Sequence, residues 1–409
     1  MTSVPAAAPR RPETLSVAVL GLGYVGLPTG LALREAGFDV LGVDISEPRL
    51  DAIRAGRVDL LARDRPRLAR ALRSGRFALT SDAAALADAD AVLIAVPTPV
   101  DGRRRPDPRA LTAACAATVE HARAGQTIVL TSTTYVGTTR ALLARPLAAR
   151  GLEPGGDVHV AFAPERINPG DPLYEQAAVP RVVGGVTPAC ADAAARVLSA
   201  TASELRVVSS AEAAELTKLH ENTFRAVNLA LANEMAAAAS LYGVNPEEVV
   251  AAAATKPYGY LAHRPGPGVG GHCIPVDPYY LLTPLQAAGV PAPLTERALA
   301  AIAARPADVA DRLLARTGPS PRVLLVGVAY KAGVGDCRTS PAREIAQRLE
   351  RRGARVAYHD PLVATCDGLA RVDDPDPRDY DAVLVTVKHP DHDYAYLDGA
   401  PNVVDAATL

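Results

Sequence analysis

Apolar residues in the first half of the chain form short continuous runs, each followed by an alanine-rich stretch with helical spacing. The runs stand at residues 15–20, 39–43, 91–96, 127–131, 158–162 and 179–184. Strands buried on both faces show no polar alternation, and strands that alternate with helices are typical of a parallel sheet covered by helices on both sides. The pattern therefore predicts a doubly wound, Rossmann-like α/β domain over residues 15–205.

The chain from residue 211 to residue 242 contains neither glycine nor proline and is rich in Ala, Leu and Glu. This composition predicts one continuous helix within a central helical domain over residues 206–315. The broad Ala/Leu face of the helix predicts pairing with a second copy about a two-fold axis, and so a homodimer.

Apolar runs return near the end of the chain, at residues 323–328, 355–358 and 382–387. They predict a second, smaller Rossmann-like domain over residues 316–409, joined to the first by the central helical domain. Residues 1–14, rich in Ala and Pro, are expected to form a disordered tail.

The first apolar run leads into GLGYVG at residues 21–26, and residues 27–36 have a helical pattern. This is GxGxxG between a strand and a helix, where glycines let the backbone approach a pyrophosphate and the helix N-terminus offers unpaired N–H groups. The expected cofactor contacts in the motif are Gly21, Gly23, Tyr24, Val25 and Gly26. The later Rossmann-like domain lacks such a motif, so we expect a single dinucleotide site.

The second apolar run ends at Asp44. An acidic residue at this distance from the glycines accepts hydrogen bonds from the ribose hydroxyls and repels the 2′-phosphate of NADP. We therefore predict NAD as the cofactor, with nearby Arg49 as a further contact that softens the discrimination.

Composition narrows the class of protein. The 409 residues are 49% hydrophobic, enough for several cores, and the formal net charge of −2 gives no electrostatic case for nucleic acid or an anionic membrane as partner. No apolar run long enough to span a membrane and no signal-peptide core are present. The five cysteines have no paired spacing, so reduced thiols in the cytoplasm are expected, and neither a disulfide framework nor a metal site.

One cysteine stands in an unusual setting. Residues 264–280 read RPGPGVGGHCIPVDPYY, a glycine- and proline-rich loop around Cys273. Asp277 and Pro278 have the pattern of an N-cap and a first helical residue, so the thiol is expected about one turn before a helix N-terminus, where partial positive charge favours thiolate. A nucleophile is one interpretation, and a buried structural cysteine is the other.

The chain prefers arginine and contains four lysines: Lys218, Lys256, Lys331 and Lys388. Lys218 and Asn222 lie four apart on the predicted long helix, so both can reach one ligand, although a solvated helix pair is an equally simple explanation. Lys331 follows the apolar run 323–328, at the carboxyl end where α/β sheets bind ligands, and Arg338 lies just beyond it.

Seven ordered motifs extend this picture over nearly the whole chain. They are GLGYVGLP at residue 21, AVPTP at 95, STTYVGTT at 132, APERINPGD at 163, KLHENTFRAVN at 218, GVGGHCIPVDP at 268 and GVAYKAGVGDCRTSP at 327. Together they resemble the UDP-glucose/GDP-mannose dehydrogenase family of nucleotide-sugar 6-dehydrogenases. TKPYGY at 255 and PGPGVGGHCIPVDPYYL at 265 are most similar to the UDP-N-acetylglucosamine 6-dehydrogenase type.

The resemblance implies oxidation of a sugar C6 alcohol to the uronic acid by two hydride transfers to NAD, with a thiohemiacetal and then a thioester on Cys273. By matching positions it implies catalytic roles for Thr133, Glu165, Lys218, Asn222, Cys273 and Asp277. It adds Pro97, Thr98 and Thr133 to the cofactor contacts. The implied substrate contacts are Glu165, Arg166, Asn168, Lys218, Asn222, Arg264, Gly270, Lys331 and Arg338. The nucleotide sugar is expected in a cleft between the two Rossmann-like domains.

Three departures from the family pattern bear on substrate choice. His263 and Arg264 replace an aromatic pair, Pro169 replaces a second glutamate, and Ile302 stands near a position where asparagine is common. UDP-N-acetylmannosamine and UDP-glucose are therefore alternative substrates. A two-electron β-hydroxyacid dehydrogenase and a non-catalytic nucleotide-binding protein are alternative classes; about two, one or no NADH per substrate separates the three classes.

Overall fold

The computed structural model describes residues 15–58, 60, 64–166 and 178–409. The predicted disordered tail and Asn168 lie outside the described residues. The chain divides into two compact units: the first runs to His220 and includes Tyr279–Pro284, and the second comprises Glu221–Pro278 and Leu285–Leu409. The three-part division near residues 205 and 315 stays a prediction.

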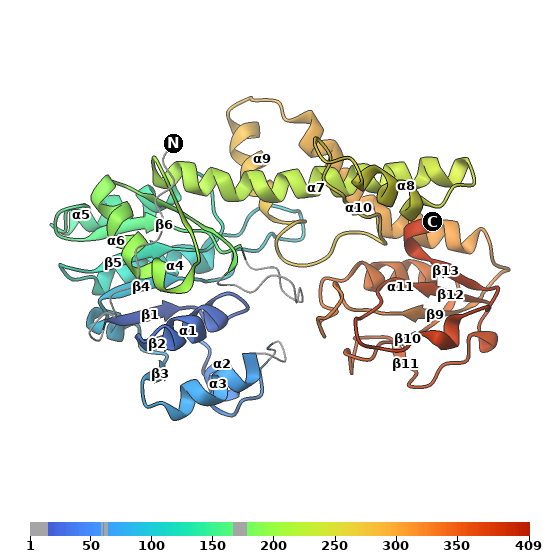
Figure 1. The fold of residues 1–409 in the computed structure, drawn as a ribbon, viewed down its shortest axis with the longest axis horizontal. Helices are drawn as coiled ribbons and strands as arrows, with labels where there is room; N and C mark the ends of the chain where they lie inside the picture. Colours follow the sequence, from blue (N-terminus) through green and yellow to red (C-terminus); the bar gives the residue numbers. More distant parts are fainter. Residues whose placement is uncertain (1–14, 59, 61–63, 167–177) are drawn as a thin grey trace. The chain divides into compact units, whose positions relative to one another are not determined.

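The first unit is built on an eight-stranded sheet with the order β3-β2-β1-β4-β5-β6-β7-β8 (Figure 1). The strands are β1 (Ser16–Leu20), β2 (Asp39–Val43), β3 (Phe77–Thr80), β4 (Ala91–Ile94), β5 (Thr127–Leu130), β6 (His159–Phe162), β7 (Arg181–Gly185) and β8 (Leu205–Val208). Its first six strands are parallel and have the Rossmann order, which confirms the predicted doubly wound sheet. β7 runs antiparallel to β6, whereas the sequence pattern predicted a parallel strand there.

Helices cover both faces of this sheet. Val17 and Val19 of β1 point into a core with Leu31 of α1, whereas Ala18 and Leu20 point into a second core with Leu111 of α4. This alternation explains the continuous apolar runs, because both faces of each strand are buried. The helices of the unit are α1 (Gly26–Glu35), α2 (Glu47–Arg54), α3 (Asp64–Arg73), α4 (Arg109–His121), α5 (Arg145–Ala149) and α6 (Pro188–Leu198). Short helical turns occupy Ala83–Asp88, Arg140–Ala144 and Ser199–Thr201.

The predicted long helix is confirmed as α7 (Ala211–Leu241), which has 31 residues. The Ser210 hydroxyl accepts a hydrogen bond from the backbone N–H of Ala213, which caps the N-terminus. Gly243 (φ +68°) follows the last turn, where a left-handed residue ends helices. The first ten residues of α7 belong to the first unit and the rest to the second.

The second unit contains a five-stranded parallel sheet with the order β11-β10-β9-β12-β13. Its strands are β9 (Arg322–Val326), β10 (Arg355–His359), β11 (Ala370–Arg371), β12 (Ala382–Val385) and β13 (Val403–Asp405). The remaining helices are α8 (Pro246–Ala254), α9 (Asp277–Ala287), α10 (Pro293–Leu314) and α11 (Pro341–Arg351), with short turns at Pro377–Asp379, Ala395–Leu397 and Ala406–Thr408. Within α9, Tyr279–Pro284 belong to the first unit. Apolar residues of α10 and α11 pack on β9 and β12, as expected for a second Rossmann-like sheet.

Candidate active site

The glycine motif of the first unit forms a tight turn between β1 and α1. Gly21 has φ +92°, and a Cβ on Gly26 would lie 1.8 Å from the Gly21 carbonyl oxygen. A Cβ on Gly23 would meet nothing within 4 Å, so this position faces open space. The turn therefore needs glycine at 26 for its own packing and leaves room for a ligand at 23. Tyr24 is 37% exposed beside it, and Val25 precedes the first residue of α1.

Asp44 and Arg49, both predicted to contact the cofactor, form hydrogen bonds with the backbone of this turn. The Asp44 carboxylate accepts hydrogen bonds from the backbone N–H groups of Leu22 (2.8 Å) and Ser46 (2.9 Å). Arg49 Nε donates to the Leu22 carbonyl (3.1 Å). Asp44 thus stands at the end of β2 beside the glycine turn, in the position suited to ribose hydroxyls. These residues fit a bound NAD.

The loops after β4 and β5 lie next to each other at the carboxyl edge of the sheet. Ser132 Oγ accepts a hydrogen bond from Val96 N (2.9 Å) and donates one to Val96 O (2.8 Å), which ties the loops together. Pro97 and Thr98 follow β4, and Thr133 follows β5. All three predicted cofactor contacts therefore share the edge at which β1 enters the glycine turn.

Glu215 of α7 holds the loop that contains Thr133. Its buried carboxylate accepts hydrogen bonds from Gly137 N (2.5 Å), Thr139 N (2.8 Å) and Thr139 Oγ1 (2.7 Å). Burial raises the pKa of Glu215. Because Lys218 lies one turn further along α7, this contact fixes the helix relative to the Thr133 loop within the first unit.

Glu165 follows β6 and is 9% exposed. Its Oε2 accepts a hydrogen bond from Arg181 NH2 at 2.5 Å, and its Oε1 accepts one from Arg166 N at 2.8 Å. Lys218 Nζ donates to the Glu165 carbonyl at 2.9 Å. The structure thus brings together the predicted residues Glu165, Arg166 and Lys218.

Arg181 was missed by the sequence analysis. It is the first residue of β7, is 5% exposed and forms a buried ion pair with Glu165. The available signal was an arginine at the start of an otherwise apolar strand, because a buried arginine requires a partner.

In the second unit, Cys273 occupies a turn whose backbone is anchored. Its carbonyl accepts hydrogen bonds from Val276 N (3.0 Å) and Asp277 N (2.7 Å). Helix α9 begins at Asp277 itself, so the expectation that Asp277 is the N-cap was off by one residue. The Asn222 amide donates to the Asp277 carboxylate, and both side chains are buried.

All five cysteines are among the described residues, and Cys273 alone is exposed. Burial raises the pKa of Cys115 to about 12 and also raises the pKa of Cys366. Burial lowers the pKa of His272, so this neighbouring imidazole is neutral at physiological pH and supplies no positive charge. The accessible thiol is therefore the one that the sequence motif indicated.

The cysteine loop packs on the turn after β9. A Cβ on Gly270 would lie 2.6 Å from Thr339 O and 2.9 Å from Tyr330 Cβ, and Gly271 N donates to Thr339 Oγ1 (3.1 Å). Gly270, predicted as a substrate contact, is thus also required for this packing. Burial, followed by the negative charge of Asp336, raises the pKa of Tyr330 to about 12, so the phenol stays protonated.

The remaining predicted substrate residues of the second unit carry positive charge. Lys331 is partly buried in the turn after β9. Arg338 forms a two-pronged pair with Asp336, at 3.0 Å from Nε to Oδ1 and 2.8 Å from NH2 to Oδ2. Arg264 pairs with Glu247 of α8. Their roles toward a substrate stay predictions.

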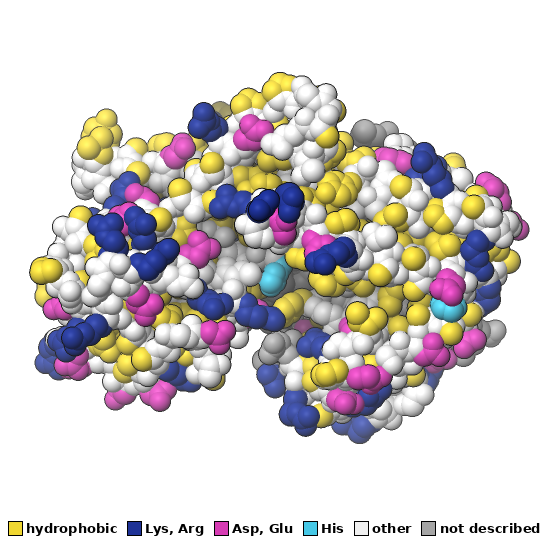
Figure 2. Space-filling model, turned by 180° about the vertical axis from the view of Figure 1, so that it is seen from behind, with side chains coloured by type: hydrophobic (Ala, Val, Ile, Leu, Met, Phe, Trp, Pro, Cys, Tyr) yellow, Lys and Arg dark blue, Asp and Glu magenta, His cyan; other side chains and the backbone are white. Residues whose placement is uncertain are grey.

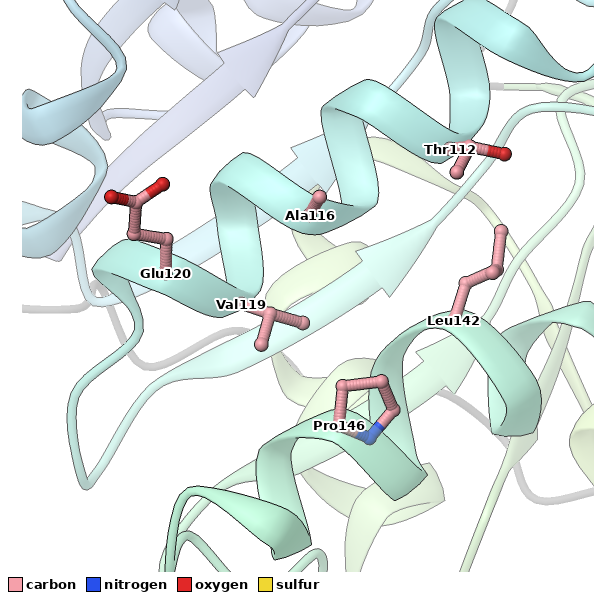
Figure 3. Close-up of a pocket in the computed structure, with 6 residues that line it drawn as sticks. All are labelled: Thr112, Ala116, Val119, Glu120, Leu142 and Pro146. Carbon is pink, nitrogen blue, oxygen red and sulfur yellow. The ribbon is translucent and has the colours of Figure 1, made fainter.

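Lys and Arg side chains are interspersed with Asp and Glu on the face drawn in Figure 2. A depression of about 370 Å³ between α4 and the helical segment 140–149 has a mainly apolar lining, with Thr112, Ala116, Val119, Glu120, Leu142 and Pro146 (Figure 3). In the described parts of the chain no cluster of His, Cys, Asp and Glu is arranged to hold a metal ion. Nor does any described helix combine the length and apolarity needed to cross a membrane.

The Rossmann strand order, the glycine turn and Asp44 place the first unit among dinucleotide-binding oxidoreductases. Family models confirm and sharpen this class: the chain belongs to the UDP-glucose/GDP-mannose dehydrogenase family. The NAD binding domain of the family matches residues 15–201, the central domain 212–301 and the UDP binding domain 324–408. The protein is therefore an NAD-dependent nucleotide-sugar dehydrogenase.

Individual relatives are similar to this protein over most of its chain. An NDP-N-acetyl-D-galactosaminuronic acid dehydrogenase of Ralstonia nicotianae is 38% identical, across 82% of this chain and 80% of the relative. A UDP-N-acetyl-D-mannosamine dehydrogenase of Pyrococcus horikoshii is 35% identical, across 92% and 90%. The solved structure of a UDP-glucose dehydrogenase from Pyrobaculum islandicum matches with a TM-score of 0.88 at 30% identity, across 98% and 96%.

Proposed function

We propose that the protein oxidises the C6 alcohol of a UDP-N-acetylhexosamine, UDP-N-acetylglucosamine first, to the uronic acid in four electrons. The observation that carries this proposal is the exposed Cys273 on an anchored turn, while the other four cysteines are buried. A two-electron alcohol dehydrogenase has no need for such a thiol.

The first oxidation makes the C6 aldehyde. When bound, NAD accepts the hydride that leaves C6. Asp277, held by the Asn222 amide, and a water held by Thr133 take the hydroxyl proton. The Lys218 ammonium stabilises the negative charge that develops on the oxygen.

The thiol then captures the aldehyde. Cys273 sulfur attacks C6, a C–S bond forms, and the carbonyl oxygen takes a proton to give a thiohemiacetal. Loss of a second hydride and of the hydroxyl proton leaves a thioester. Covalent capture keeps the aldehyde in place for this second oxidation.

Hydrolysis releases the product. Glu165, paired with Arg181, accepts a proton from the water that attacks the thioester carbon. The C–S bond breaks, the thiolate of Cys273 is regenerated, and the uronate leaves. In sum one alcohol, two NAD and one water give one acid and two NADH, with release of protons.

The sugar is proposed from sequence similarity. Relatives named for N-acetylmannosamine and N-acetylgalactosaminuronic acid support an acetamido sugar and leave its C2 and C4 configuration to experiment. UDP-glucose is the second candidate substrate, because a solved structure with that name has the same fold.

The test is a kinetic comparison of UDP-GlcNAc, UDP-GalNAc, UDP-ManNAc and UDP-glucose, with NADH counted against uronate. About two NADH per uronate are expected, with an acetamido sugar preferred. One NADH with release of the aldehyde would contradict the thioester pathway. A preference for UDP-glucose would overturn the sugar assignment and leave the chemistry intact.

We also propose a homodimer formed through α7. Its second-unit part exposes Phe224, Leu231 and Met235, each about half exposed, and their spacing places them on one face. Exposed large apolar side chains at such spacing favour a partner helix. We also propose a cytoplasmic location, because the unpaired spacing of the five cysteines predicts reduced thiols.

A further inference from the structure

A buried Asp–His pair lies at the carboxyl edge of the second unit's sheet. Asp360 follows β10 and is 0% exposed, and His389 follows β12 and is 3% exposed. β9 lies between these two strands. The proposed mechanism does not use either residue.

The contacts of His389 determine its protonation. Gly333 N donates to His389 Nδ1 at 3.0 Å, and a backbone N–H can only donate. Nδ1 is therefore unprotonated, and the ring proton lies on Nε2. From there it reaches the Asp360 carboxylate, 3.1 Å from Oδ1 and 3.2 Å from Oδ2.

The Asp360 carboxylate accepts hydrogen bonds from backbone N–H groups as well as from His389. Its Oδ2 accepts hydrogen bonds from Val328 N (2.7 Å) and Ala329 N (3.1 Å), and its Oδ1 accepts from Leu362 N (2.8 Å). Burial raises the pKa of Asp360, but the hydrogen bonds from His389 and these backbone groups outweigh it, so the pKa lies below its ordinary value. The carboxylate therefore stays ionised.

The Asp360–His389 pair accepts hydrogen bonds from both ends of the turn after β9. Asp360 holds Val328 and Ala329 at its start, and His389 holds Gly333 at its end. Between these points lie Tyr330, which packs beside Gly270 and Gly271 of the cysteine loop, and Lys331. The position of the lysine thus depends on an imidazole that lies outside the turn.

We propose that His389, as the neutral Nε2-protonated imidazole, is a positioning residue for nucleotide-sugar binding. It acts through Gly333 on Lys331. The inference rests on the proposed contact of Lys331 with the sugar nucleotide. A pair that only stabilised the fold would not distinguish one substrate from the other.

Two substitutions divide the functions of the ring. Asparagine offers an amide oxygen near the place of Nδ1, so His389→Asn can still accept from Gly333 N. Glutamine offers an amide N–H near the place of Nε2, so His389→Gln keeps the bond to Asp360 and leaves Gly333 without its acceptor. The two variants are matched in polarity and charge.

For His389→Gln we expect KM for the UDP-sugar to rise about tenfold, since one lost hydrogen bond costs roughly a factor of ten in affinity, with KM for NAD unchanged. His389→Asn should raise it by a factor of about three at most. Equal rises for both substrates, an unchanged KM in the glutamine variant, or a larger effect in the asparagine variant would overturn the proposal.

Lys331→Ala separates this inference from the proposed function. If Lys331→Ala leaves KM for the UDP-sugar unchanged, the role of Lys331 is wrong. If it raises KM while His389→Gln does not, only the role of His389 is wrong. If His389 acts through the lysine, the double variant has the KM of Lys331→Ala alone, whereas independent effects multiply.

The tautomer can be measured in the wild-type enzyme, with His389→Asn used only to assign the signal. Nitrogen NMR of the wild-type enzyme with isotope-labelled histidine, assigned by the signal missing from His389→Asn, should show an unprotonated Nδ1 and a protonated Nε2 at neutral pH. A doubly protonated ring, or the opposite tautomer, would contradict the proposal.

Discussion

The side-chain amide of Asn222, in the middle of α7, donates a hydrogen bond to the carboxylate of Asp277 at the start of α9. Both residues are buried, and Asp277 N also binds the Cys273 carbonyl. Two residues predicted from separate motifs are thus coupled to the turn that carries the thiol. Asn222 therefore acts on the cysteine turn through Asp277.

Replacing the thiol tests the covalent pathway. Cys273→Ser should abolish uronate formation while NAD binding is retained, because serine keeps the shape of the side chain without its nucleophilicity. NADH release and uronate would be measured together with the Kd for NAD. Cys115→Ser replaces a buried thiol that is distant from Cys273 in the sequence. This variant serves as a control and should remain active. Full turnover by Cys273→Ser would rule out the thioester.

The glycine turn offers a matched pair of substitutions. Gly26→Ala should lower the free energy of unfolding by about 3 kcal/mol, because its Cβ would overlap the Gly21 carbonyl. Gly23→Ala should fold normally and weaken NAD binding at least about tenfold, because its Cβ enters the open space beside the turn. Thermal unfolding and NAD titration check both. Tight NAD binding by Gly23→Ala would place the cofactor elsewhere.

Cofactor choice depends on the charge of Asp44. Asp44→Asn should reduce the NAD/NADP ratio of kcat/KM about tenfold or more, because the repulsion of a 2′-phosphate is lost. Asp51→Asn removes the same charge from an exposed site on α2 and should leave the ratio unchanged. The thermal midpoint must be compared as well, since Asp44 also accepts two backbone hydrogen bonds. An unchanged ratio would mean that Asp44 does not face the ribose.

The apolar face of α7 predicts how subunits pair. Leu231→Glu together with Met235→Glu should convert the proposed dimer to a monomer. In a symmetric interface each subunit would contribute both charges, and all four would be buried together. Light scattering after size exclusion gives the mass. Arg225→Glu, exposed on the same helix, is the charge control. A dimer that survives the double substitution would place the interface on another surface.

Much of this architecture was predictable because its signals are local. The run before Gly21, the acid at the end of β2 and the absence of glycine and proline in α7 each depend on nearby sequence alone. The cysteine loop was equally visible, since its glycines and prolines are adjacent to Cys273 in the sequence. Apolar runs predicted six strands of the first sheet, composition predicted the long helix, and the glycine-rich loop singled out the cysteine that is exposed.

The missed features depend on contacts distant in sequence. The role of Arg181 depends on its ion pair with Glu165, and that of His389 depends on its contacts with Asp360 and Gly333. No local sequence pattern links these residues. The direction of β7 was also missed, because a buried strand has the same composition whether it runs parallel or antiparallel. Strands β11 and β13 escaped notice since they are only two and three residues long.

The antiparallel direction of β7 determines which contacts a C-terminal truncation would remove. In a sheet with only parallel strands, the end of one strand and the beginning of the next lie at opposite edges. Because β7 is antiparallel to β6, its first residue, Arg181, lies at the same edge of the sheet as Glu165, which follows β6. A chain cut after Glu165 would keep every loop that fits the cofactor but would lose the ion-pair partner of Glu165. The cofactor loops and the Glu165–Arg181 ion pair therefore require different lengths of chain in the same sheet.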